Sequence, residues 1–152
     1  MKVHKWKRWY VVANRIEAAF YAEGRDEEFH FVERLENADG RLTEKELDSD
    51  KPGRGFSSSS GTVHHSLDRR SHRHENVAKK FAHQIAGMLD SNRQKGTYKD
   101  LVLVAEPHFL GLLRAELTSP TRELVSHEVG HDYARASDSE LEAQIRAAMD
   151  SK

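Results

Sequence analysis

The stretch of sequence that decides the fold class is Leu101-Val102-Leu103-Val104-Ala105-Glu106-Pro107. Its first five residues are all apolar. An unbroken apolar run of this length is typical of a strand that is covered on both faces of a sheet. Pro107 stands where a helix would begin, because proline is favoured at the first helical position. The stretch therefore predicts a strand and then a helix, within a parallel or mixed sheet that has helices on both faces.

Three more strands are expected earlier in the chain. Residues 9–13, 17–22 and 29–35 are rich in β-branched and aromatic side chains. The turns between them are expected at Asn14-Arg15 and at Gly24-Arg25-Asp26. Strands that follow one another so closely along the chain pair antiparallel, so these segments predict a three-stranded meander.

The remaining elements are expected from apolar spacing and capping signals. Apolar residues recur every three or four positions across 77–89, which predicts an amphipathic helix. A shorter helix is expected near residues 43–47, and a strand at 124–129. The capping box Ser137-x-x-Glu140 predicts the start of a final helix.

Without the short helix near residues 43–47, these elements give the order βββ-α-β-α-β-α, which is the order of the ribonuclease H-like fold. We therefore predict an α/β, ribonuclease H-like three-layer domain with a mixed five-stranded sheet. The 152 residues are expected to form a single domain, 1–152.

Composition limits the classes of function. The chain contains no cysteine, which excludes disulfides, thiolate zinc sites and cysteine nucleophiles. Its net charge of −1 gives no overall attraction to nucleic acid or anionic lipid, so any such attraction must come from a local patch. No apolar stretch approaches membrane-spanning length, and the basic N-terminal residues precede only a short apolar run. We expect a cytoplasmic protein that does not insert into membranes.

The sign of the charge changes near residue 50. Across 36–50 acidic residues outnumber basic ones, whereas across 51–74 five basic residues face the single acid Asp68. The glycine- and serine-rich segment Pro52–Gly61 has little to bury, so we predict a mobile loop at about 50–73. The predicted phosphate-binding residues of this segment are Lys51, Gly53, Arg54, Gly55, Arg69, Arg70 and Arg73.

One catalytic motif requires a separate interpretation. His127-Glu128-Val129-Gly130-His131 matches the H-E-x-x-H pattern of zinc metalloproteases, which needs both histidines on one helix face. The motif overlaps the predicted strand at 124–129, where His127 and His131 would lie about 13 Å apart. We therefore predict no metal site, and we keep a zinc hydrolase that uses His127 and His131 as the alternative.

Several segments together resemble one bacterial family, the host-attachment proteins, described as required for attachment to host cells. The matching stretches are WYVVANRIEAAFY (Trp9–Tyr21), DKPGRGF (Asp50–Phe56), HENVAKKFAHQIAGML (His74–Leu89) and LVLVAEPHFLGLLR (Leu101–Arg114). The family is similar in turn to the middle domain of archaeo-eukaryotic peptide-chain release factors. That domain carries a Gly-Gly-Gln loop, where this chain has Gly53-Arg54-Gly55-Phe56-Ser57.

The resemblance implies a position for the loop and no catalytic residue, since Phe56 and Ser57 replace the second glycine and the glutamine. We expect a non-catalytic binding protein that needs no cofactor and contacts the ribosome, structured RNA or a protein through its basic Gly/Ser loop. A degenerate peptidyl-tRNA hydrolase is the second alternative within the enzyme class.

Overall fold

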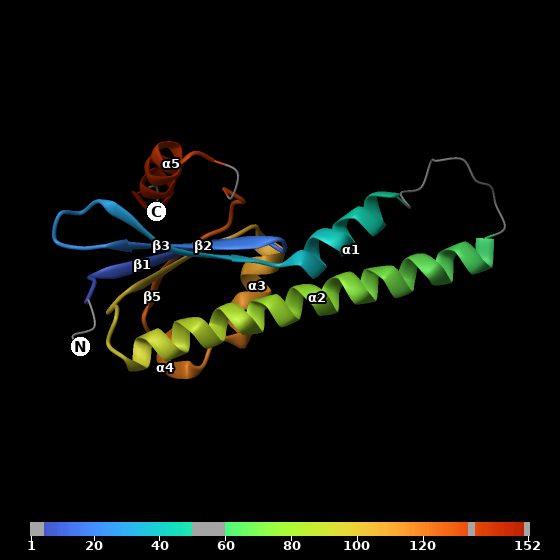
Figure 1. Ribbon diagram of the computed structural model, residues 1–152, viewed down its shortest axis with the longest axis horizontal. Helices are drawn as coiled ribbons and strands as arrows, with labels where there is room; N and C mark the ends of the chain where they lie inside the picture. The colour runs from blue at the N-terminus through green and yellow to red at the C-terminus, as the bar shows by residue number, and fades with distance from the viewer. Residues whose placement is uncertain (1–4, 50–59, 134–135, 151–152) are drawn as a thin grey trace.

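A computed structural model describes residues 5–49, 60–133 and 136–150 of the chain. Its centre is a five-stranded sheet with the strand order β3-β2-β1-β4-β5 (Figure 1). The first three strands pair antiparallel, whereas β1, β4 and β5 run parallel. The predicted mixed sheet and the antiparallel meander are therefore confirmed. The strands are β1 (Arg8–Ala13), β2 (Glu17–Glu23), β3 (Phe29–Glu36), β4 (Leu101–Val104) and β5 (Val125–Val129).

Helices cover both faces of the sheet. On one face α2 and α3 enclose a core that contains Trp9, Phe81 and Phe109. On the other face α5 encloses a smaller core around Tyr10 and Ile145. Figure 1 shows α5 on the opposite side of the strands from α2. The helices are α1 (Ala38–Ser49), α2 (Ser60–Gln94), α3 (Pro107–Glu116), α4 (Ser119–Arg122) and α5 (Asp138–Asp150).

The central strand β4 and the helix after it match the expectation closely. All four residues of Leu101–Val104 are fully buried, and the strand has neighbours on both sides. Pro107 is the first residue of α3, and the carboxylate of Glu106 caps that helix. It accepts the backbone N–H of Phe109 at 2.7 Å and that of His108 at 3.0 Å. At the start of α5 the hydroxyl of Ser137 accepts the N–H of Glu140 at 3.4 Å, in agreement with the predicted capping box.

The prediction of a loop through residue 73 is wrong. α2 begins at Ser60 and runs for 35 residues, so residues 60–73 are helical and only the part from residue 77 was foreseen. No proline interrupts α2, and no glycine lies between Thr62 and Ala86. A helix with mostly polar side chains buries only a narrow strip of its surface. Its sequence therefore shows no clear apolar periodicity. Here α1 provides that contact.

α1 is also longer than the five residues expected, and with the start of α2 it forms a helical hairpin. We call residues 38–49 of α1 together with residues 60–74 of α2 the α1–α2 hairpin. α2 is about 52 Å long at 1.5 Å per residue, and Figure 1 shows its first half extending past the sheet beside α1. Among the described helices, none is long and apolar enough to span a bilayer.

Candidate functional site

The structure divides the predicted binding residues into two groups. Arg69, Arg70 and Arg73 lie on α2 within the α1–α2 hairpin, in a helix and not in a loop. The side chains of Arg69 and Arg73 are exposed, and Arg70 is half-buried. The other four predicted residues, Lys51, Gly53, Arg54 and Gly55, fall outside the described residues.

The hairpin brings the acidic and basic segments of the sequence side by side. The guanidinium of Arg73 hydrogen-bonds the carboxylate of Glu46 on α1. At the next residue of α2, Nε2 of His74 lies 3.0 Å from Glu44, also on α1. The charge pattern of the sequence predicts that Arg73 binds a partner. In the structure its charge is compensated in part by Glu46, within the hairpin itself.

His74 is the buried centre of a polar cluster at the base of the hairpin. Its ring is 7% exposed, and Nη1 of Arg15 lies 3.2 Å from Nε2. Burial of the ring and the neighbouring Arg15 charge hold the pKa of His74 below its ordinary value. Glu75 lies 3.9 Å from Arg15 and 2.9 Å from Nε2 of His108 on α3. We call Arg15, Glu44, His74, Glu75 and His108 the His74 cluster.

The His74 cluster joins four parts of the fold: the β1–β2 turn, α1, α2 and α3. A close backbone approach strengthens the same junction. A Cβ atom built on Gly40, in the first turn of α1, would lie 2.1 Å from the carbonyl oxygen of Arg15. Only glycine lets α1 approach the β1–β2 turn so closely. The direction of the hairpin relative to the sheet is therefore fixed by polar contacts and one glycine.

A cleft of about 400 Å³ lies beside this junction, at the carboxyl ends of β1, β4 and β5. Ligands often bind at this edge of open α/β sheets. Here, however, the acids already have structural contacts: Glu44 with His74, Glu17 with Arg34 at 3.2 Å, and Glu106 with the start of α3. The cleft is lined by Asn14, Arg15, Ile16, Glu17, Arg41, Glu44, Glu106 and Asp132.

The H-E-x-x-H motif does not lie on a helix. His127 and Glu128 are in β5, Val129 ends that strand, and His131 follows it. The carboxylate of Glu128 forms an ion pair with Arg114 of α3. Within residues 5–49, 60–133 and 136–150, neither histidine belongs to a group of three potential metal ligands. The helical arrangement that the zinc mechanism requires is therefore absent from this part of the chain.

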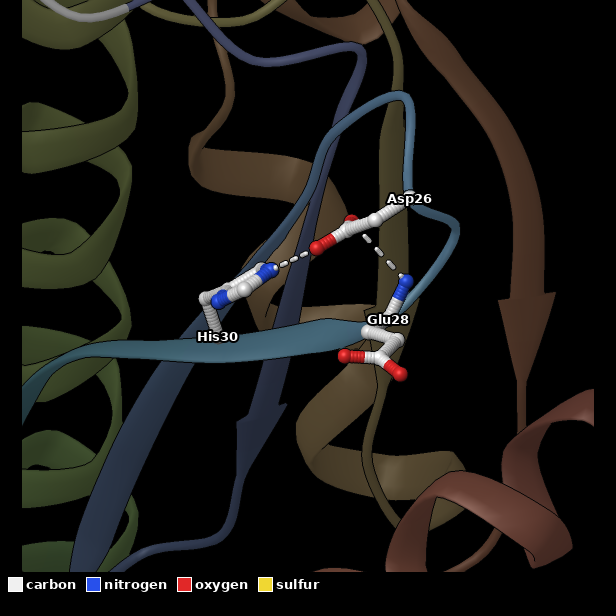
Figure 2. Close-up of side chains that lie close together, drawn as sticks. All are labelled: Asp26, Glu28 and His30. Carbon is white, nitrogen blue, oxygen red and sulfur yellow. Dashed lines mark hydrogen bonds and ion pairs between the residues drawn. The ribbon is translucent and has the colours of Figure 1, made fainter.

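The one group of potential metal ligands in the described part of the chain is at the β2–β3 turn. Atoms of Asp26, Glu28 and His30 lie within 4.8 Å of one another. Asp26 accepts the backbone N–H of Glu28 at 3.1 Å and contacts Nε2 of His30 at 2.7 Å. Figure 2 shows the Glu28 carboxylate turned away from that pair. The hydrogen bond from the Glu28 backbone, followed by that from His30, lowers the pKa of Asp26. These contacts stabilise the turn, and they explain why the three side chains lie close together.

A buried carboxylate at the end of β2, next to this turn, is likewise structural. Glu23 is 2% exposed and accepts a hydrogen bond from the hydroxyl of Tyr10. Arg8 and Arg146 lie 3.8 and 3.7 Å from it. Burial, opposed in part by the hydrogen bond to Arg8, raises the pKa of Tyr10 to about 12. The cluster ties β1 and β2 to α5.

Sequence reasoning missed a run of basic residues that continues along α2 past the hairpin. Lys79, Lys80 and His83 are exposed and lie on the helix face opposite the buried Ala78, Phe81 and Ala82. The signal was present in the sequence, because these residues follow Arg69 and Arg73 at helical spacing. The basic run is not apparent when apolar periodicity alone places the start of the helix at residue 77.

Comparison with protein families is decisive for the identity of the chain. A family described as "Protein required for attachment to host cells" has a model that matches residues 9–145. The chain belongs to this host-attachment family. The resemblance predicted from Trp9–Tyr21 and Leu101–Arg114 is thereby confirmed.

Two kinds of match, a curated protein and solved structures, show low similarity to the chain. An uncharacterised protein of Rickettsia prowazekii (strain Madrid E) is 32% identical over 62 residues, which are 41% of this chain and 40% of that protein. Among solved structures, an archaeal protein aligns with a TM-score of 0.44 and 11% identity, over 95% of this chain and 38% of the other. An archaeal translation termination factor aligns with a TM-score of 0.41 and 12% identity, over 95% and 39%. The chain thus spans about two fifths of the length of these relatives.

Proposed function

We propose that this host-attachment protein is a non-catalytic binding module that contacts structured RNA or the ribosome through the α1–α2 hairpin. The contact would use Arg69, Arg70 and Arg73, together with Lys51, Gly53, Arg54 and Gly55 of the segment that connects the two helices. Because ribosomes and structured RNA lie in the cytoplasm, the proposal includes a cytoplasmic location. We also assign the ribonuclease H-like fold, which the element order and the mixed sheet support.

The observation that carries the proposal is the projection of the hairpin beyond the sheet (Figure 1). A helix that buries little of its own surface against the domain remains available for a partner. Its exposed basic residues, Arg69 and Arg73, are suited to phosphate oxygens, to which guanidinium groups donate paired hydrogen bonds. The hairpin is anchored at its base by the His74 cluster, so these residues are held in a defined direction.

The contacts of the polar residues favour binding over catalysis. The acids of the cleft and the buried Glu23 are engaged in caps and ion pairs that hold elements together. Glu128, the general base of the zinc alternative, is paired with Arg114. These contacts support a domain whose charged side chains orient the hairpin.

Filter binding with purified ribosomes and with tRNA tests the proposal. The triple variant Arg69→Ala, Arg70→Ala, Arg73→Ala should weaken binding at low salt, and wild-type binding should fall steeply as salt rises, because counterions are released from phosphates. The triple Arg→Lys variant keeps the charges and is the matched control. It should retain most of the binding, although lysine cannot reproduce paired guanidinium bonds. Absence of wild-type binding at low salt, or equal binding by the triple alanine variant, would exclude this function.

A further inference from the structure

The exposed face of α2 carries only basic or uncharged residues over most of its described length. From Arg69 to Gly87 the acid on this helix is Glu75, and its side chain is turned to the half-buried flank, where it contacts His108. A 19-residue helix surface without an exposed acid is unusual for a chain in which 32% of the residues are charged and the net charge is −1. The exposed residues are Arg69, Ser71, His72, Arg73, Asn76, Lys79, Lys80, His83, Gln84 and Gly87.

The basic members of this set form a single stripe. Residues three, four or seven positions apart lie on one side of a helix, which aligns Arg69, His72, Arg73, Lys79, Lys80 and His83 along α2. We call these six residues the α2 basic face. The arginines and lysines of this face, from Arg69 to Lys80, span about 16 Å at 1.5 Å per residue.

The second half of this face is rigid. The side of α2 opposite Lys79 and Lys80 is buried against the sheet through Ala78, Phe81 and Ala82, which are at most 2% exposed. Lys79 and Lys80 therefore project from a fixed part of the domain, whereas Arg69 and Arg73 project from the hairpin. A partner that contacts both pairs must be long and must carry negative charge along its length.

We propose that the α2 basic face is a phosphate-backbone contact for nucleic acid, and that Lys79 and Lys80 form its second half on the body of the domain. The choice of partner rests on the function proposed above, which uses Arg69 and Arg73, whereas Lys79 and Lys80 are additional residues. A nucleic-acid strand offers regularly spaced phosphates along a line, which suits a straight row of basic side chains on one helix. Contacts of this kind position the partner without reading its sequence.

The surroundings of the stripe favour nucleic acid over a membrane surface. Helices that lie on membranes place apolar side chains beside their basic residues and insert them among the lipids. The apolar side of α2 is already buried in the core, and the exposed positions between Lys79 and Gly87 are polar or glycine. Among the side chains that the structure describes, Glu46 pairs with Arg73 and Glu116 lies 2.8 Å from Nδ1 of His83, both at the margins of the stripe. Against the opposing effect of burial, the hydrogen bond with His108 and nearby charges that include Lys79 lower the pKa of Glu75 on the half-buried flank.

The test compares two double variants of the full chain. Lys79→Ala with Lys80→Ala removes two charges from the stripe. Lys95→Ala with Lys99→Ala removes two exposed charges from the segment between α2 and β4, and is the matched control. Binding to a short labelled duplex RNA, and to duplex DNA of the same sequence, is measured by fluorescence anisotropy between about 50 and 200 mM salt. Sedimentation with phosphatidylserine vesicles provides the membrane arm, and circular dichroism checks the fold.

The Lys79/Lys80 variant should bind RNA about tenfold more weakly at low salt, and the slope of log affinity against log salt should fall by about two. The Lys95/Lys99 control should match wild type. If the variant loses affinity equally for RNA and DNA, the stripe contacts phosphates alone. If it loses affinity for RNA and not for DNA, the phosphates that it contacts are those of RNA. Loss of binding in the Arg69/Arg70/Arg73 variant with normal binding by the Lys79/Lys80 variant overturns this inference and leaves the proposed function standing. Wild-type binding to vesicles but not to either nucleic acid overturns both.

Discussion

The body of the domain and the α1–α2 hairpin are stabilised by different forces. In the body, two apolar cores enclose the sheet, and β4 is buried on every side. In the hairpin, Arg73 pairs with Glu46 and His74 contacts Glu44, and Leu42 of α1 is 59% exposed. Apolar burial contributes far more to stability than exposed ion pairs do. The hairpin is therefore expected to open locally at a lower free energy than global unfolding.

The largest expected effect tests the body. Leu103→Ala removes a fully buried side chain from the central strand and should lower the free energy of unfolding by about 3 kcal/mol. Leu42→Ala makes the same chemical change on the hairpin and should cost less than about 0.5 kcal/mol. Urea denaturation followed by circular dichroism measures both. Similar losses in the two variants would contradict the distinction between the two regions.

A smaller effect is expected at the junction of the two regions. Gly40→Ala places a methyl group against the Arg15 carbonyl, a backbone atom that cannot move aside cheaply. The change should cost about 1–3 kcal/mol and should increase amide hydrogen exchange in α1 more than in β4. Gly87→Ala, with no atom within 4 Å of the added carbon, is the control and should stabilise α2 by up to about 1 kcal/mol. If α1 exchanged no faster in Gly40→Ala, the junction would not set the position of the hairpin.

The His74 cluster should make stability depend on pH. The pKa of His74 is lower in the folded protein than its ordinary value of 6.5, so the unfolded chain binds the proton more tightly. The neutral His74 ring makes its full contribution to the free energy of unfolding above pH 6.5. That contribution is lost as the pH falls from 6.5 through the folded-state pKa. His74→Gln should remove part of the decline in the free energy of unfolding at acidic pH, whereas His72→Gln, at an exposed neighbour, should not. Denaturation at a series of pH values measures this, and identical profiles for wild type and His74→Gln would refute it.

The smallest effect on stability is expected at the Arg73–Glu46 pair. Both side chains are about half exposed, so Glu46→Gln should change the free energy of unfolding by less than about 1 kcal/mol. The same change releases the Arg73 charge and should strengthen RNA binding a few-fold at low salt. Glu33→Gln removes an equal charge from the exposed side of β3 and serves as the control. A change in affinity that is equal in the two variants would reflect net charge and not the hairpin.

Sequence reasoning was most accurate where apolar side chains are buried. The unbroken run Leu101–Ala105 predicted β4, and the three N-terminal strands were placed within one or two residues of their observed ends. The predicted helix at 77–89 coincides with the part of α2 that lies on the sheet, because only that part buries a regular apolar stripe. The first half of α2 and most of α1 were missed, since a polar helix supported by a neighbouring helix leaves no periodic apolar pattern.

The candidate site was predicted less well than the fold. Arg69, Arg70 and Arg73 were identified from charge alone, but their helical setting and the Arg73–Glu46 pair were not. The pairing depends on two segments 27 residues apart in sequence, which no local pattern reveals. Lys79 and Lys80 were overlooked because a basic stripe becomes visible only when the helix is known to continue through both regions.

The sequence by itself determined the order of the five strands and of the helices that bury an apolar stripe, and the resemblance to the host-attachment family. These depend on local patterns: the spacing of apolar side chains, the caps and the turn residues. The tertiary structure alone decided that β5, which carries His127 and Glu128, pairs with β4, that His74 is buried among charges, and that the basic residues of α2 share one exposed face. Exposure and charge pairing are properties of contacts between distant segments, so they are settled only when the chain has folded.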